Sequence, residues 1–160
     1  MTTAEVLPSL PQDITAQWLS PKISVKNAMI QVKKIITGTA TLVLISAMPE
    51  DGSQPISVCV KGGFNPTMLS QFPFILSLYT REVDFYNNLA PRVPHLNVPR
   101  KLWAEKSADN AVVIMEDICA ASFVFSDPVE TWPVHRVKKV VEQFAALHAA
   151  TWGVEAASVP

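Results

Sequence analysis

The sequence predicts an α+β fold in which a five-stranded antiparallel sheet packs with helices. Short runs of β-branched and apolar residues, separated by turn-forming residues, are typical of strands. Two longer segments, residues 69–89 and 134–151, instead repeat their apolar residues at the spacing of a helix. The predicted order is a short helix, three strands, a helix, two strands and a helix, which fits an α+β domain.

The N-terminal segment is expected to contribute one short helix. Residues 1–12 are polar and contain proline, so we expect a flexible lead-in there, followed by the domain at residues 13–152 and a tail at residues 153–160. Asp13 is expected to cap a helix that carries Trp18 and Leu19 and that Pro21 ends.

Three strand-like segments follow, at residues 25–36, 39–48 and 56–61. The first is only moderately strand-like, whereas the second is rich in β-branched and apolar residues. Residues 49–54 (Pro-Glu-Asp-Gly-Ser-Gln) have the composition of a turn. The second and third strands are therefore expected to pair as an antiparallel hairpin.

The second half of the chain contains the two long helices and two further strands. Ser70 and Pro73 are expected to open the helix at residues 69–89, and Pro91 and Pro94 to stop it. Residues 98–105 and 111–118 are predicted strands joined by a polar turn. The helix at Val134–Thr151 collects on one face the residues Val137, Val140, Val141, Phe144, Leu147 and His148.

Glu82 is the most informative residue of the middle helix. It falls near the centre of the apolar stripe formed by Ile75, Leu78, Phe85, Tyr86 and Leu89. A buried, unpaired carboxylate costs several kcal/mol, so a cation is expected to meet it. The best candidate is Lys61, which closes the strand at residues 56–61.

The period of that strand places Lys61 on the same face as Ser57 and Cys59, which suits a lysine that reaches over a ligand cavity. A lysine at a strand end that extends into water is the alternative interpretation. The position of Glu82 favours the pair.

Two further segments have residue types that suit a nucleotide. Gly38 lies between threonines in a turn whose amides and hydroxyls could bind phosphate oxygens, although an ordinary β-turn explains the same residues. The strand at 111–118 changes abruptly from apolar to acidic at Glu116, Asp117 and Ile118. This change indicates either a hinge that contacts an adenine edge or a buried strand that ends at a solvated turn.

The remaining candidates have simpler interpretations. His148 is expected to be a hydrogen-bonded core residue of the last helix. Cys59 and Cys119 lie in apolar runs without metal-ligand spacing, so we expect reduced core thiols and no metal site.

Composition excludes several classes of partner. The net charge of −1 gives no electrostatic reason to bind nucleic acid or an acidic membrane. The chain has no signal peptide pattern and no apolar run long enough for a bilayer, so a cytoplasmic location is expected. Apolar residues reach 49% and charged residues only 17%, against about 25% in an average chain. Such a surface is often covered by a partner or a second copy.

Four segments in order resemble the N-terminal half of the aminoglycoside phosphotransferase and choline-kinase-like superfamily, most closely its ecdysteroid-kinase-like branch. The resemblance covers roughly residues 10–152 and rests on the segments 59–64 (Cys-Val-Lys-Gly-Gly-Phe), 81–86 (Arg-Glu-Val-Asp-Phe-Tyr), 114–118 (Ile-Met-Glu-Asp-Ile) and 146–149 (Ala-Leu-His-Ala).

The resemblance implies a protein-kinase-like N-terminal lobe with residues 69–89 as its αC-like helix. It also implies that Lys61 contacts nucleotide phosphates, that Glu82 orients Lys61, and that residues 116–118 form the adenine-side hinge. ATP is a candidate cofactor from the resemblance alone, and the residues themselves establish no cofactor.

The catalytic loop and metal ligands of such kinases follow the segment that matches residues 146–149. This chain has no His-x-Asp motif, and its last aspartate is Asp127. We therefore expect a truncated kinase-like lobe that is not a phosphotransferase by itself. We also expect that the helix Val134–Thr151, without a second lobe, is covered by a second copy in a homodimer, by a partner chain, or by folding back on its own sheet.

Two functions remain open at this stage. The first is a pseudokinase-type binding or regulatory module with a partial nucleotide site. The second is a repurposed lobe of specialised metabolism that binds an apolar small molecule and catalyses a cyclisation or isomerisation, with Glu82, Asp117 or His148 as acid or base.

Overall fold

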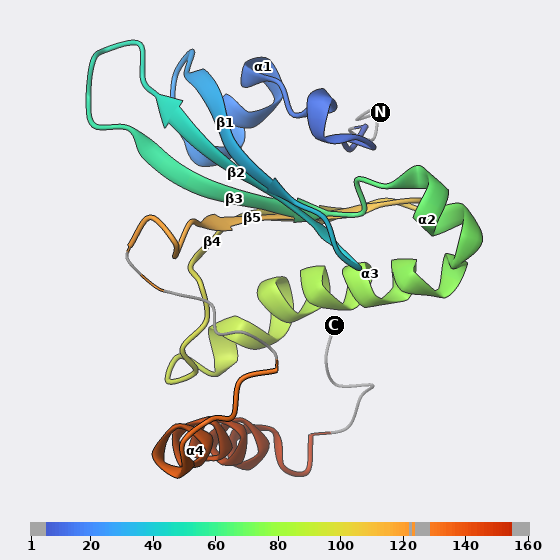
Figure 1. Cartoon of the computed structure of the whole chain (residues 1–160), viewed down its shortest axis with the longest axis vertical. Coiled ribbons are helices and arrows are strands. Elements are labelled where there is room, and N and C mark those ends of the chain that lie inside the picture. The colour runs from blue at the N-terminus through green and yellow to red at the C-terminus, as the bar shows by residue number, and fades with distance from the viewer. Residues whose placement is uncertain (1–5, 122, 124–128, 155–160) are drawn as a thin grey trace.

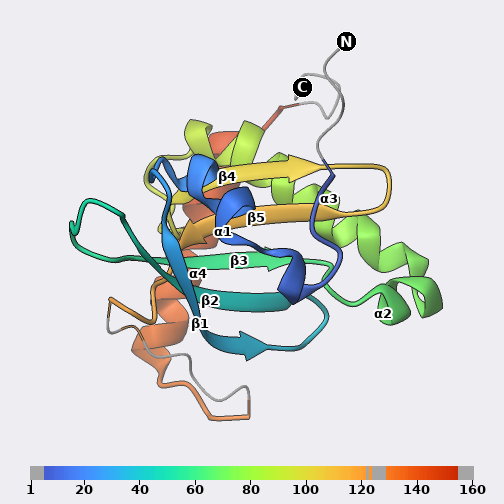
Figure 2. The same cartoon turned by 90° about the horizontal axis from the view of Figure 1, so that it is seen from above.

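The computed structural model describes residues 6–121, 123 and 129–154. A five-stranded antiparallel sheet with the order β1-β2-β3-β5-β4 forms the centre, as predicted (Figure 1). Helix α3 lies on one face of the sheet and the N-terminal segment on the other (Figures 1 and 2). The strands are β1 Met29–Ile36, β2 Thr41–Met48, β3 Ile56–Gly62, β4 Lys101–Lys106 and β5 Ala111–Glu116. The α-helices are α1 Ala16–Leu19, α2 Pro66–Gln71, α3 Leu76–Asp84 and α4 Val134–Thr151.

The hairpin of β2 and β3 forms as predicted, with Ile45 opposite Val58 and Leu42 opposite Lys61. The turn between these strands has Gly52 at φ 75°, a backbone conformation that glycine adopts without steric cost. Strand β1 pairs with β2 as an edge strand, and a bulge interrupts its ladder between Val32 and Lys34.

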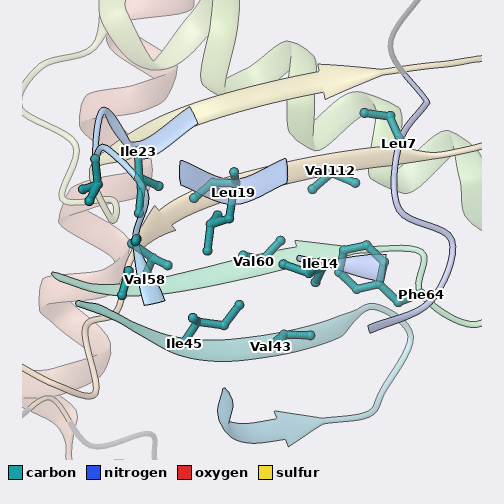
Figure 3. Close-up of a cluster of buried hydrophobic side chains, with 14 residues drawn as sticks. Leu7, Ile14, Leu19, Ile23, Val43, Ile45, Val58, Val60, Phe64 and Val112 are labelled. Atoms are coloured by element: carbon teal, nitrogen blue, oxygen red, sulfur yellow. The ribbon is translucent and has the colours of Figure 1, made fainter. Parts of the chain in front are cut away.

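Alternation along the strands divides the core into two clusters, one on each face of the sheet. On one face, Val58 and Val60 pack with apolar residues of the N-terminal segment such as Leu19 (Figure 3). On the other face, Cys59 and Val113 pack with Val83 and its neighbours on α3. The prediction that Val58 and Val60 point away from Cys59 and Lys61 is confirmed.

Part of the segment expected as a lead-in, residues 6–12, packs against the domain. Within its described part, Leu7 is only 5% exposed and belongs to the core. The sequence predicted Asp13 as the cap of the first helix, and this prediction is wrong. Thr15 caps this helix, because its hydroxyl accepts the Trp18 amide at 3.2 Å. The Asp13 carboxylate instead accepts the amides of Ser9 and Leu10 and stabilises the preceding turn.

The prediction of a single helix at residues 69–89 is wrong, because this part of the chain forms several short helical segments. Phe72 precedes Pro73, and its φ of −131° and ψ of 70° lie outside the helical region. Asn65 therefore caps a separate helix α2, with its side chain accepting the Met68 amide. The 3-10 turn Pro73–Ile75 leads into α3, which continues as the π-helical turn Phe85–Leu89 and the 3-10 turn Ala90–Arg92.

Helix α4 has the predicted bounds but lies beyond α3, away from the sheet (Figure 1). None of its residues is buried. It begins after Pro133, which occupies the N-cap position. Across the described parts of the chain, no helix is both long and apolar enough to span a membrane.

Candidate functional site

An ion pair between the sheet and α3 forms the centre of the site. Lys61 lies near the end of β3, and its Nζ is 2.7 Å from Oε1 of Glu82. The two side chains are 29% and 26% exposed, so the pair is largely but not fully withdrawn from water. The predicted pairing of Lys61 with Glu82 is confirmed.

The apolar surroundings of Glu82 differ in detail from the predicted stripe. Ile75 and Tyr86 are buried as expected, whereas Leu78 is 46% exposed. With Leu78 exposed and its own side chain 26% exposed, Glu82 lies at the margin of the core and not at its centre. This position lets the carboxylate reach Lys61 and also face solvent.

Two cavities share the ion pair. The first, of about 200 Å³, lies between the sheet and the segment after β5. The second, of about 310 Å³, lies between α3 and the turn that contains Thr39. Lys61, Glu82 and Leu42 line both, so the ammonium group of Lys61 stands where the cavities meet. The first is lined by Ile36, Leu42, Leu44, Cys59, Lys61, Glu82, Tyr86, Pro99, Met115, Glu116, Asp117, Ile118 and Cys119.

The three residues predicted as a hinge all line the first cavity. Strand β5 ends at Glu116, whose carboxylate accepts the Arg100 amide at 2.8 Å. The Asp117 amide donates to Ser57 of β3, and the Asp117 carboxylate accepts the Cys119 amide at 2.9 Å. The Ile118 amide has no hydrogen-bond partner among the described residues. The acidic side chains thus shape the turn, and the Ile118 carbonyl accepts the amides of Ala121 and Phe123.

Two titratable side chains in the wall of this cavity, Cys59 and Tyr86, are uncharged at neutral pH. Burial raises the pKa of the Cys59 thiol to about 12, and the nearby Asp117 charge adds to the effect. Burial also raises the pKa of Tyr86 to about 12, with a further contribution from Glu82. The Tyr86 hydroxyl lies 3.8 Å from the Met115 sulfur. The charged residues of this lining are Lys61, Glu82, Glu116 and Asp117, and most of the remaining lining is apolar.

Gly38 lies in the turn between β1 and β2, but it lines neither cavity, whereas its neighbours Thr39 and Ala40 line the second. A side chain at Gly38 would meet only the Ala40 carbonyl, at 3.5 Å. The Thr41 side chain, at the start of β2, is 3% exposed and so is turned away from solvent and from a ligand. The turn can therefore approach a ligand through Thr39 and Ala40.

His148 is not the core residue that the sequence suggested, because it is exposed on α4. Its ring lies 6.5 Å from that of Phe144, and it lines a shallow depression with Trp152 at the end of the helix. It lines neither cavity of the Lys61 pair. Asp117 does line the first cavity. Asp127 lies outside the described residues.

Both cysteines are free thiols, as expected, with Cys59 buried and Cys119 half-buried. Within the described ranges, no group of histidine, cysteine, aspartate and glutamate residues could hold a metal ion.

Sequence reasoning missed three residues that support the site, namely Tyr79, Asn110 and Gly63. Tyr79 donates its hydroxyl to the Thr39 carbonyl, and Asn110 accepts the Gly63 amide at 3.2 Å. The paired glycines after Lys61 were the available signal, because a strand end that requires glycine often marks a close approach of side chains.

Comparison with known proteins gives one family. The model of the ecdysteroid kinase-like family matches residues 39–158. Neither curated proteins nor solved structures yield a match. The matched range contains the ion pair, both cavities except Ile36, and the segment after β5, whereas most of the N-terminal segment precedes it.

Proposed function

The chain belongs to the ecdysteroid kinase-like family, and we propose that these 160 residues form a nucleotide-binding module that does not transfer phosphate by itself. The sheet, α3 and the segment after β5 have the arrangement of a kinase-like N-terminal lobe. In this proposal ATP places its adenine in the first cavity and its phosphates beside Lys61.

The position of Lys61 is the observation that carries the proposal. Its ammonium group is held 2.7 Å from Glu82 at the junction of the two cavities. A ligand that extends from one cavity to the other must pass this charge. A lysine held by a helix glutamate is the arrangement with which kinases contact nucleotide phosphates.

The first cavity supports adenine as the group bound there. Its volume of about 200 Å³ is below the ~300–1,000 Å³ of pockets that enclose a drug-sized ligand, so it suits one ring system. The unpartnered Ile118 amide supplies a hydrogen-bond donor at the rim. Apolar walls such as Leu44 and Met115 suit the faces of a flat ring.

The absence of transfer is proposed from the sequence. Phosphoryl transfer needs an aspartate that positions the acceptor and further Asp and Asn side chains that hold Mg²⁺. These 160 residues contain no His-x-Asp motif, and the described residues include no group of side chains that could hold a metal ion. Such a module would bind nucleotide and act as a regulatory or partner-completed unit.

Calorimetric titration with ATP and adenosine tests the proposal. We expect ATP to bind the native chain and to lose about tenfold or more in affinity for Lys61→Ala, because a charge-assisted contact to phosphate is removed. Adenosine should bind both proteins alike. Lys106→Ala is the matched control, since Lys106 also pairs with an α3 carboxylate, that of Asp84, but lines neither cavity. Equal ATP affinity in Lys61→Ala, or no binding by the native chain, would overturn the proposal.

A second candidate rests on the largely apolar lining of the first cavity. An apolar small molecule could occupy it and be cyclised or isomerised, with Glu82 or Asp117 as acid or base. A thermal-shift panel of apolar metabolites, run beside ATP, separates the two candidates. Stabilisation by apolar compounds alone would favour this second function.

A further inference from the structure

Tyr79 connects α3 to the turn between β1 and β2. The residue is 6% exposed, and its hydroxyl donates a hydrogen bond to the Thr39 carbonyl. Thr39 and Tyr79 both line the second cavity, beside Lys61. The turn at residues 37–40 is therefore attached to α3 by a buried side chain as well as by its flanking strands.

The ring of Tyr79 also fixes the end of β3. A side chain at Gly63 would lie 2.7 Å from the Tyr79 ring, so this glycine lets the ring pack directly against the backbone. The Gly63 amide donates to Asn110 Oδ1 at 3.2 Å, and Asn110 Nδ2 donates to the Pro8 carbonyl at 2.6 Å. The backbone two residues after Lys61 is thus held from both sides.

These contacts place three parts of the site in one rigid arrangement. Glu82 follows Tyr79 by about one turn of α3, so the same short helix directs one side chain to Lys61 and the other to Thr39. The distance between the ammonium of Lys61 and the turn at 37–40 therefore depends on Tyr79.

We propose that Tyr79 is a positioning residue for the phosphates of the bound nucleotide, holding the turn at residues 37–40 over the second cavity. This inference rests on the proposed function, because it assumes that phosphates lie beside Lys61. It predicts selectivity among ligands. Neither Tyr79 nor Thr39 lines the first cavity, so a ligand without phosphates should not depend on the tyrosine hydroxyl.

The first test needs no ligand. Tyr79→Phe keeps the ring against Gly63 and removes only the hydroxyl. We expect amide hydrogen exchange in residues 38–41 to accelerate about two- to tenfold, the range for one lost hydrogen bond. Thr80→Val is the matched control, since among the described residues its hydroxyl bonds within α3, to the Ser77 carbonyl. Unchanged exchange in Tyr79→Phe, or equal acceleration in Thr80→Val, would overturn the proposal.

The second test compares ligands by calorimetry. For Tyr79→Phe we expect ATP affinity to fall about two- to tenfold while adenosine affinity stays within experimental error. Equal weakening of both ligands would show a general structural role and overturn the proposal. If the native chain binds neither ligand, the nucleotide function and the phosphate role both fail. Faster exchange in the first test would then show only that Tyr79 holds the turn.

Discussion

At the scale of single residues, the Lys61–Glu82 pair raises the question of why charges stand beside an apolar wall. An exposed ion pair contributes only about 0.2–1 kcal/mol, whereas removing one partner of a buried pair costs about 3–5 kcal/mol. With side chains about a quarter exposed, this pair lies between these limits and is a weak source of stability. Its position between two cavities supports the proposed role of the pair in binding a ligand.

The Cys59 thiol predicts how stability depends on pH. Burial raises its pKa from 9.0 to about 12, so the folded chain keeps this proton at a pH at which the unfolded chain releases it. Its contribution is complete below the unfolded pKa and is lost as pH rises through the window from 9.0 to about 12. Between pH 9 and 10 we expect the free energy of unfolding to fall by about 1 kcal/mol more in the native chain than in Cys59→Ala.

Urea unfolding at several pH values measures this difference. Cys59→Ala will lower stability at neutral pH as well, because it leaves a small cavity, so the change with pH is the informative quantity. Cys119→Ala serves as the control and should keep the alkaline loss. An identical pH dependence in the native chain and Cys59→Ala would contradict the assignment to Cys59.

At the scale of elements, the sequence predicted best where a regular period meets a buried face. The alternation in β2 and β3 and the 3.6-residue repeat of α4 led directly to their bounds within a few residues. The prediction of one helix at 69–89 failed because apolar residues continue with helical spacing across Phe72 and Pro73. The prediction followed this spacing, whereas in the structure Pro73 keeps Phe72 out of the helical conformation. The packing of Leu7 could not be predicted from the sequence. Leu7 lies in an irregular segment without a repeating apolar pattern, and the position of such a segment depends on tertiary contacts.

The same distinction applies to the site. Lys61 and Glu82 were predicted because strand and helix periods place each on a known face, and opposite charges indicate a pair. Tyr79 and Asn110 were missed because they bond to backbone carbonyls, those of Thr39 and Pro8. Any residue supplies a carbonyl, so the sequence carries no signal for the partner.

Gly63 tests whether the junction after β3 is as tightly packed as its contacts indicate. A Cβ there would lie 2.7 Å from the Tyr79 ring and 2.9 Å from Asn110 Oδ1, closer than van der Waals contact allows. We expect Gly63→Ala to lower the free energy of unfolding by about 1–3 kcal/mol, as overpacking does. Urea denaturation measures it.

Gly38→Ala is the matched control, because its nearest atom would be the Ala40 carbonyl at 3.5 Å, an ordinary contact. We expect its stability to change by less than about 0.5 kcal/mol or to rise slightly. If Gly63→Ala were as stable as Gly38→Ala, the junction after β3 would be able to relax. The close packing of the Tyr79 ring against Gly63 would then not require a glycine there.

At the scale of the whole molecule, helix α4 is the element without a cover. Of the three expectations for its apolar face, folding back on the sheet is excluded, because no residue of α4 is buried. Val137, Val141 and Phe144 are 44%, 56% and 56% exposed. A hydrogen bond from the Asn97 amide to the Gln143 side chain joins α4 to the described residues before it. The apolar stripe is therefore available for contact with a second copy or a partner chain.

We expect a second copy, and the stripe itself gives the reason. The apolar stripe lies around the midpoint of α4 and contains Val137, Val141 and Phe144. Two copies of the helix that cross near their centres about a twofold axis would therefore pack the stripe of one copy against the same stripe of the other. Light scattering on a sizing column should then give twice the 17.5 kDa of the chain. Phe144→Lys should shift the mass to that of a monomer, because a charge in the apolar contact is not compensated. Ala150→Lys adds the same charge on the opposite side of the helix and should leave the dimer intact. A native chain that elutes as a monomer at every concentration would contradict the homodimer and favour a partner chain on the apolar stripe.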